Sequence, residues 1–238
     1  MVLRKDKPAW RDLWLLPIAL VGIFAFSGLE MLVALNFHAP FNEDTLNGVG
    51  AIGQMLSYIV VLIVFYYFHY EEMPGRLSAG WAYVKKHWLF LVIVLLIVMG
   101  LESLYNQLMA MLPEGIGFKE TQNEESLDVL FKNPAFLPLS FLFVVILAPV
   151  VEELFFRNVI IGELGKKFNY IVMGVISAIT FAGMHVIGAT SPFEFGSYFI
   201  IAVALVYVYF KSGKNTAATI FIHMTNNLVS FIMTAFFS

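Results

Sequence analysis

The chain has 238 residues, of which 60% are hydrophobic and 13% are charged, and its formal net charge is −3. An ordinary soluble domain is about half apolar, so this composition indicates a membrane protein. The small net charge argues against nucleic acid as a partner. The absence of cysteine excludes disulfides, thiolate metal sites and a cysteine nucleophile.

Continuous apolar stretches of about 20 residues predict membrane-spanning helices, since a helix of that length crosses the hydrocarbon core. They lack the alternation over about ten residues that marks the strands of a membrane barrel. The predicted fold class is an all-α, polytopic transmembrane helix bundle. Its seven spans run about Trp14–Asn36, Val49–Tyr70, Trp88–Leu112, Ala135–Gly162, Asn169–Gly188, Phe195–Phe210 and Thr216–Phe236.

Loop charges set the predicted orientation, because cytoplasmic connections of membrane proteins are rich in Lys and Arg. The longest connection, Pro113–Pro134, is mostly acidic and is predicted to lie outside, so the N-terminus is cytoplasmic. The short loops suit a bacterial plasma membrane. An alternative with eight segments places Pro74–His87 along the inner surface. Basic residues mark the N-terminal segment and the connections at Arg76/Lys85/Lys86, Lys166/Lys167 and Lys211/Lys214.

Two adjacent glutamates, Glu152 and Glu153, follow an almost purely apolar run in the fourth span. A charge at the centre of a bilayer costs at least about 2.5–3.5 kcal/mol, so these carboxylates need partners or a function. Glu153 and Arg157 lie four residues apart on one helix face and are predicted to pair. Glu152 points about 100° away and is free for a second role. Pro149 lacks an N–H and should free a backbone carbonyl near the carboxylates.

Histidines on the fifth and seventh spans supply two further polar clusters. Phe181 and His185 lie four residues apart on one face of the fifth span, and His223 and Asn227 do so on the seventh. Glu152 and Asn227 fall near the middle of their spans. By the same count, His185 falls about 10 Å closer to the outer side, at a rise of about 1.5 Å per residue. Helix tilt or a shifted span boundary would absorb this difference, so the grouping of the motifs takes precedence over the span edges.

One catalytic interpretation joins the three clusters. Hydrolysis of a peptide bond needs an activated water and hydrogen-bond donors aimed at the developing oxyanion. A carboxyl group in a low-dielectric site, such as Glu152, suits a general base or acid near neutral pH. One histidine would share the water, while the other histidine and an Asn amide would donate to the oxyanion. Arg157 would balance the charge of Glu153.

The motifs Glu-Glu-x-x-x-Arg, Phe-x-x-x-His and His-x-x-x-Asn occur in this order on three polar helices. Together they resemble the CAAX-protease and bacteriocin-processing (Abi) family, which includes the Ras-converting CAAX endopeptidase. The resemblance covers about Phe136–Phe236 and implies a glutamate-dependent intramembrane endopeptidase. The implied roles are water activation for Glu152 and His185, oxyanion stabilisation for His223 and Asn227, and support of the site for Glu153 and Arg157.

The family has also been described as metalloproteases, and the sequence offers a zinc alternative. Glu152, His185 and His223 would form a set of two histidines and one carboxylate. The zincin signature His-Glu-x-x-His is absent from the chain. A mechanism without a metal or other cofactor is therefore favoured.

The expected partners are membrane lipid and a short peptide or protein-tail substrate, with or without a lipid anchor. Two other functions use the same residues. The buried glutamates and histidines would serve as a proton relay in an ion-coupled transporter, but no inverted repeat links the two halves of the chain. A non-catalytic membrane scaffold is the third interpretation, in which the Glu153–Arg157 pair and the histidines only position helices.

Residues 1–134 and 135–238 are interpreted as two parts of one integral membrane domain, the second being the CAAX-protease-like part. Glu102 and Asn106 in the third span belong to the first part. A structural or interfacial role is favoured for both, and lining of a substrate cavity is the alternative. His69, at the end of the second span, is expected to be solvated or interfacial.

Overall fold

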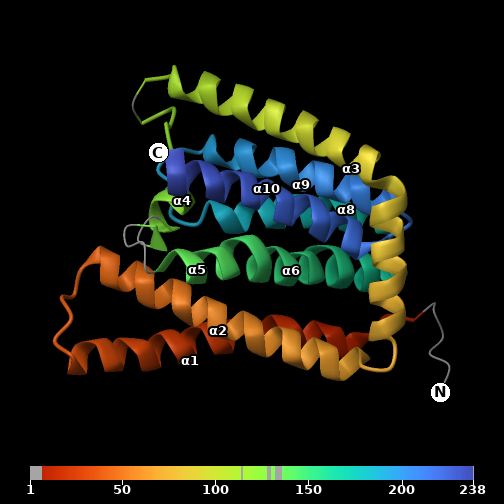
Figure 1. Ribbon diagram of the computed structural model, residues 1–238, viewed down its shortest axis with the longest axis horizontal. Coiled ribbons are helices and arrows are strands. Elements are labelled where there is room, and N and C mark those ends of the chain that lie inside the picture. Colours follow the sequence, from red (N-terminus) through yellow and green to blue (C-terminus); the bar gives the residue numbers. More distant parts are fainter. Residues whose placement is uncertain (1–6, 114, 128–129, 132–135, 238) are drawn as a thin grey trace.

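The computed structural model describes residues 7–113, 115–127, 130–131 and 136–237, and the described chain folds as a bundle of helices (Figure 1). The predicted boundary at residues 134 and 135 lies outside the described residues, and the two-part division stays a prediction. The helices are η1 (Trp10–Trp14), α1 (Leu15–Asn36), α2 (Glu43–His69), α3 (Met73–Ala110), α4 (Gln122–Leu127), α5 (Leu137–Ser140), η4 (Phe141–Leu147), α6 (Ala148–Glu153), η5 (Leu154–Leu164), α7 (Gly165–Phe168), α8 (Tyr170–His185), α9 (Glu194–Lys211) and α10 (Thr216–Phe237).

Within the described residues, six helical stretches are long and apolar enough to cross a membrane, and the apolar helix α8 is a shorter seventh. The first described residues and the end of α10 lie at opposite ends of the bundle (Figure 1). The all-α class with about seven spans is thus confirmed. The six long stretches are Trp10–Asn36, Glu43–His69, Met73–Ala110, Leu137–Phe168, Glu194–Lys211 and Thr216–Phe236.

Helix α3 breaks at His87, whose φ of −116° and ψ of 19° are not helical. The part before the break lies across one end of the bundle, and the part after it runs along the bundle (Figure 1). The break coincides with the predicted start of the third span at Trp88. The crosswise part contains the segment Pro74–His87, which the sequence analysis placed along the inner surface as an alternative.

The fourth span is one continuous rod from Leu137 to Phe168 that switches between α- and π-helical hydrogen bonding. The π-helical segments η4 and η5 flank the short α-helix α6, which contains Pro149 and ends at Glu153. Such wider turns occur often at functional sites, because they change the direction in which side chains point. The sequence predicted a disturbance at Pro149 but not the π-helical segments.

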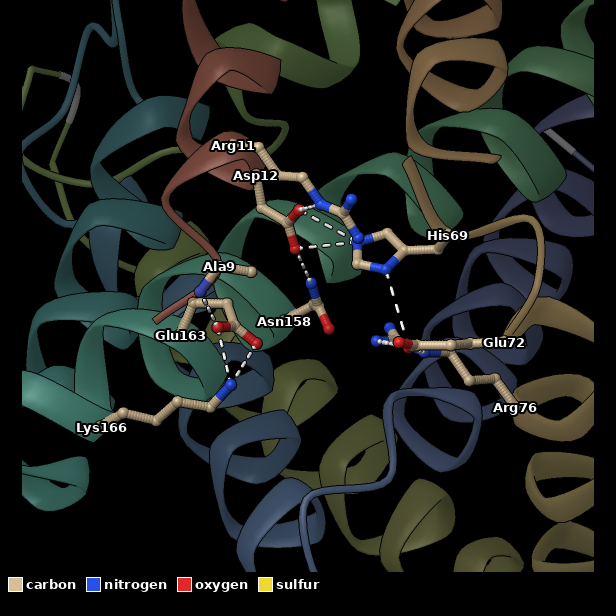
Figure 2. Close-up of polar contacts among 9 residues, drawn as sticks. All are labelled: Ala9, Arg11, Asp12, His69, Glu72, Arg76, Asn158, Glu163 and Lys166. Carbon is tan, nitrogen blue, oxygen red and sulfur yellow. Dashed lines mark hydrogen bonds and ion pairs between the residues drawn. The ribbon is translucent and has the colours of Figure 1, made fainter. Parts of the chain in front are cut away.

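A polar cluster connects Ala9 and Asp12 to the C-terminal part of this rod (Figure 2). The carboxylate of Asp12, in η1, lies 3.0 and 3.1 Å from Nε2 of His69 and accepts a hydrogen bond of 3.4 Å from Asn158 in η5. Glu163 accepts a bond of 2.6 Å from the backbone N–H of Ala9 and pairs with Lys166 at 2.7 Å. His69 is therefore buried, not solvated as expected from its position at a span end.

Candidate active site

Glu153 and Arg157 form the ion pair that their spacing predicts. Arg157 Nη1 lies 3.1 Å from Glu153 Oε1, and both side chains are fully buried. The guanidinium also lies over the ring of Phe181, 4.9 Å from its centroid, and Nη2 donates to the Ala202 carbonyl at 3.4 Å. These contacts join the fourth span to α8 and α9, so the pair fixes the position of the rod that carries Glu152.

His223, on α10, contacts both glutamates. Its Nδ1 lies 3.0 Å from Glu153 Oε1, and its Nε2 lies 3.7 Å from Glu152 Oε2. Since Glu153 is paired with Arg157 and accepts hydrogen bonds, Nδ1 carries the proton and donates it. The neutral ring then presents a lone pair at Nε2. His223 can donate from Nε2 only as an imidazolium, and the Glu153 carboxylate stabilises that cation.

His185 ends helix α8 and approaches Glu152 from the other side. Its Nδ1 donates to the Phe181 carbonyl at 2.8 Å, because a carbonyl can only accept. Its Nε2 lies 3.8 Å from Glu152 Oε2. The count along the predicted spans put His185 about 10 Å from the level of Glu152, whereas this contact agrees with the grouping of the motifs. With only 16 residues, α8 is about 24 Å long and need not be centred in the membrane.

Asn227 completes the group from α10, but one of its amide protons is already used. Its Nδ2 donates to the Val144 carbonyl at 2.9 Å. Pro149 follows Val144 by five residues and has no N–H, so the π-helical partner of this carbonyl is missing. The freed carbonyl was predicted, and Asn227 satisfies it. One N–H of the amide remains for another acceptor.

These side chains line a cavity of about 370 Å³ within the bundle. Other walls come from α2, α3, α9 and the acidic loop. Glu102 and Asn106 line the cavity, which was the alternative for them, and Asn106 also accepts a hydrogen bond of 2.6 Å from Ser197 on α9. Sequence reasoning missed Gln54, Tyr58 and Tyr198, whose only signal is a polar group in an apolar span. Lining residues that carry polar groups include Gln54, Tyr58, Glu102, Asn106, Thr121, Asn123, Glu124, Glu152, His185, Ser197, Tyr198, His223, Asn226, Asn227 and Ser230.

The three side chains predicted as alternative zinc ligands all belong to this site. Glu152, His185 and His223 do converge, with both Nε2 atoms facing Glu152 Oε2. Nevertheless, no group of three or more His, Cys, Asp or Glu side chains within the described residues is arranged so that it could hold a metal ion. The arrangement does not fit a zinc centre, and no chemical step below uses a metal.

Fold and site together define a polytopic helical membrane protein with a Glu–His centre inside a polar cavity. Residues 134–229 match the family model of the Type II CAAX prenyl endopeptidase Rce1-like domain. This match confirms the resemblance inferred from the three motifs, over a region that is less than half of the chain.

Two curated bacterial proteins match parts of the chain. "Membrane-embedded CAAX protease MroQ" of Staphylococcus aureus is 31% identical over 117 residues, which are 47% of this chain and 44% of MroQ. "Putative membrane peptidase YdiL" of Bacillus subtilis is 34% identical over 71 residues, 30% of this chain and 28% of YdiL. The matches span less than half the length of either relative. No solved structure matches the chain.

Proposed function

We propose that this protein is an intramembrane endopeptidase that hydrolyses a peptide bond in a membrane-associated peptide or protein tail. The observation that carries the proposal is the position of Glu152 Oε2, 3.8 Å from His185 Nε2 and 3.7 Å from His223 Nε2. Both separations exceed a direct hydrogen bond, so a water can contact the carboxylate and a ring nitrogen together. The match of residues 134–229 to a family model of endopeptidases supports the same activity.

In the proposed reaction, Glu152 takes a proton from this water while the water oxygen adds to the carbonyl carbon of the substrate. The lone pair at His185 Nε2 accepts the second hydrogen of the water and orients it. The C–N bond of the tetrahedral intermediate then breaks, and Glu152 returns the proton to the leaving nitrogen. General base and acid catalysis of this kind contributes about 10²–10⁴-fold to the rate.

Two donors are proposed for the oxyanion. The imidazolium form of His223 donates from Nε2, while its Nδ1–H remains on Glu153, 3.0 Å away. Asn227 donates its second N–H, since the first is held by Val144. Donors fixed in advance in a low-dielectric site stabilise the transition state strongly. In this scheme Glu153 and Arg157 do not touch the substrate and act as positioning residues.

The proposed location is a bacterial plasma membrane with the N-terminus in the cytoplasm. Loop charges support this orientation, and the two relatives are bacterial membrane proteins by name. The cavity is lined in part by Thr121, Asn123 and Glu124 of the acidic connection, so substrate would enter from the outer side. A lipid anchor on the substrate is the narrower proposal, supported by the prenyl endopeptidase description of the matching family.

The test compares membrane peptidomes of cells that carry the wild-type protein, Glu152→Gln or Glu43→Gln. Glu43 is an exposed glutamate at the start of α2 and serves as the matched control. We expect a set of cleaved termini that is present with wild-type and Glu43→Gln and absent with Glu152→Gln at equal expression. Identical termini in all three would refute the proposal. A pH-dependent flux lost with Glu152→Gln would then favour the transporter.

A further inference from the structure

The segment 115–127, which ends with α4, forms part of the wall of the cavity. Thr121, Asn123, Glu124 and Leu127 from this segment line the cavity beside the catalytic candidates. Helix α4 sits at the end of the bundle where α10 ends (Figure 1). A peptide that enters from this side must displace the segment or pass beneath it.

A single buried carboxylate fastens this segment to the rest of the molecule. Glu194, the first residue of α9, is fully buried. Its Oε2 accepts the backbone N–H of Gln122 at 2.8 Å. Its Oε1 accepts the N–H groups of Thr190 and Ser191, each at 3.0 Å, in the loop that follows His185. Glu194 therefore holds both the segment and the loop that follows α8.

Tyr198, one turn further along α9, makes a second connection between the same two parts. Its hydroxyl lies 2.7 Å from Thr121 Oγ1. Its ring stacks on the imidazole of His185, with centroids 4.7 Å apart and an interplanar angle of 24°. Phe181 contacts the same imidazole at 4.6 Å. The hydroxyl of Tyr198 thus hydrogen-bonds the segment, and its ring stacks on His185.

We infer that Tyr198 is a positioning residue that couples closure of the segment 115–127 to the orientation of His185. The inference rests on the proposed function, in which His185 Nε2 orients the attacking water. When the segment opens to admit a peptide, the Tyr198 hydroxyl loses its hydrogen bond with Thr121, and the ring gains freedom to leave the imidazole. Closure over bound substrate restores the stack. Water would thereby be oriented only when the cavity is covered.

The hydrogen bonds that hold the segment 115–127 in place allow it to open and close. Hydrogen bonds connect the segment to α9 and to the loop before it: Gln122 to Glu194, Thr121 to Tyr198 and Ser191 to the Ile116 carbonyl. Phe118 is buried and Leu127 packs against the core, so opening also separates some apolar surface. Water can replace the hydrogen bonds when the segment lifts, which lowers the cost of opening. Loops that close in this way complete a catalytic site while excluding bulk water.

The experiment separates the hydroxyl of Tyr198 from its ring. Tyr198→Phe keeps the ring that stacks on His185 and removes the hydrogen bond to Thr121. Tyr198→Leu removes the ring as well as the hydrogen bond. Tyr207→Phe is the control, since Tyr207 is an exposed tyrosine on the same helix. Opening of the segment is measured by labelling a cysteine introduced as Leu127→Cys in every variant. This cysteine is the sole thiol, because the chain has none. The probes are a membrane-impermeant maleimide and a peptide spanning the cleavage site found in the peptidome comparison.

With Tyr198→Phe we expect labelling of Leu127→Cys to quicken and KM to rise, each by about fivefold, the worth of one lost hydrogen bond. The fall in kcat should be smaller than that of Tyr198→Leu, because the ring that remains still stacks on His185 whenever the segment is closed. With Tyr198→Leu, kcat should fall by at least about tenfold as His185 loses its orientation. A purely structural role would lower the active fraction without this split between kcat and KM.

Labelling of Tyr198→Phe at the rate of Tyr207→Phe, or a wild-type kcat for Tyr198→Leu, would overturn the coupling. Glu152→Gln is assayed in parallel. If Glu152→Gln is inactive while the Tyr198 variants behave as wild type, only the coupling fails. If Glu152→Gln cleaves the peptide, the proposed function itself fails, and the labelling rates still report whether Tyr198 holds the segment.

Discussion

Nδ1 of His223 lies 3.0 Å from Oε1 of Glu153, and this contact determines which ring nitrogen faces the cavity. Arg157 contacts the same carboxylate oxygen at 3.1 Å. Glu153 therefore stands between two groups that carry or can carry positive charge. Its removal has two separable consequences, one for stability and one for chemistry.

Glu153→Gln should lower both stability and activity. Loss of one partner of a buried pair leaves Arg157 as an unpaired buried charge, which costs about 3–5 kcal/mol. The amide also stabilises the imidazolium of His223 less well than the carboxylate, so cleavage should fall by about 10²-fold. The apparent melting temperature in detergent and the cleavage rate measure the two effects.

The double variant Glu153→Gln/Arg157→Met separates them. It removes the unpaired charge, so much of the lost stability should return, because apolar replacements of buried pairs are often neutral. Cleavage should remain low, since His223 still lacks its carboxylate. Full activity in the double variant would show that Glu153 acts only on stability.

Asn227→Ala should also affect two properties, because the amide bonds the Val144 carbonyl. An unsatisfied buried carbonyl costs about 1–3 kcal/mol. Pro149→Ala in the same chain supplies an N–H to the disturbed turn and should recover part of that stability. The loss of cleavage should persist in Asn227→Ala/Pro149→Ala. Recovery of cleavage along with thermal stability would argue against an oxyanion role for Asn227.

The local parts of the site could be predicted from the sequence. Glu153 and Arg157 are four residues apart on one helix, so their pairing follows from helix geometry alone. The carbonyl freed by Pro149 follows from the chemistry of proline. The three motifs could be grouped because buried polar residues in apolar spans are rare enough to point to one site.

The parts that failed depend on how distant elements pack. The count along the spans misplaced the depth of His185 because it assumed a full-length span, whereas α8 ends at this residue. The contact between Asp12 and His69 joins residues 57 positions apart, and no periodicity signals it. Likewise, nothing in α9 indicates that Tyr198 stacks on His185 rather than facing lipid.

Metal removal tests the choice between the two mechanisms. We expect purified protein to contain far less than one zinc per chain, and 1,10-phenanthroline to leave the cleavage rate unchanged. The reason is the arrangement of Glu152, His185 and His223, which does not fit a zinc centre. Stoichiometric zinc, together with activity that the chelator removes and zinc restores, would reverse this expectation and make the three side chains ligands.

The polar cluster at the C-terminal part of the rod predicts unequal effects for two neighbouring charges (Figure 2). Asp12→Ala leaves the buried Nε2 of His69 and the half-buried amide of Asn158 without their acceptor, which should cost about 1–3 kcal/mol. Arg76→Ala removes an exposed pair with Glu72, N···O 2.7 Å, and exposed pairs contribute about 0–1 kcal/mol. Melting temperatures in detergent should therefore fall clearly for Asp12→Ala and little for Arg76→Ala.

The Arg76–Glu72 pair also predicts how the small effect of Arg76→Ala on stability depends on pH. The hydrogen bond from Arg76 lowers the pKa of Glu72 below its ordinary value. A carboxyl group with a depressed folded-state pKa contributes stability above its unfolded pKa, and that stability is lost as the pH falls through the folded value. The difference between wild type and Arg76→Ala should thus be present at neutral pH and vanish in acid. A difference that grew on acidification would mean that Glu72 stabilises the fold in its protonated form.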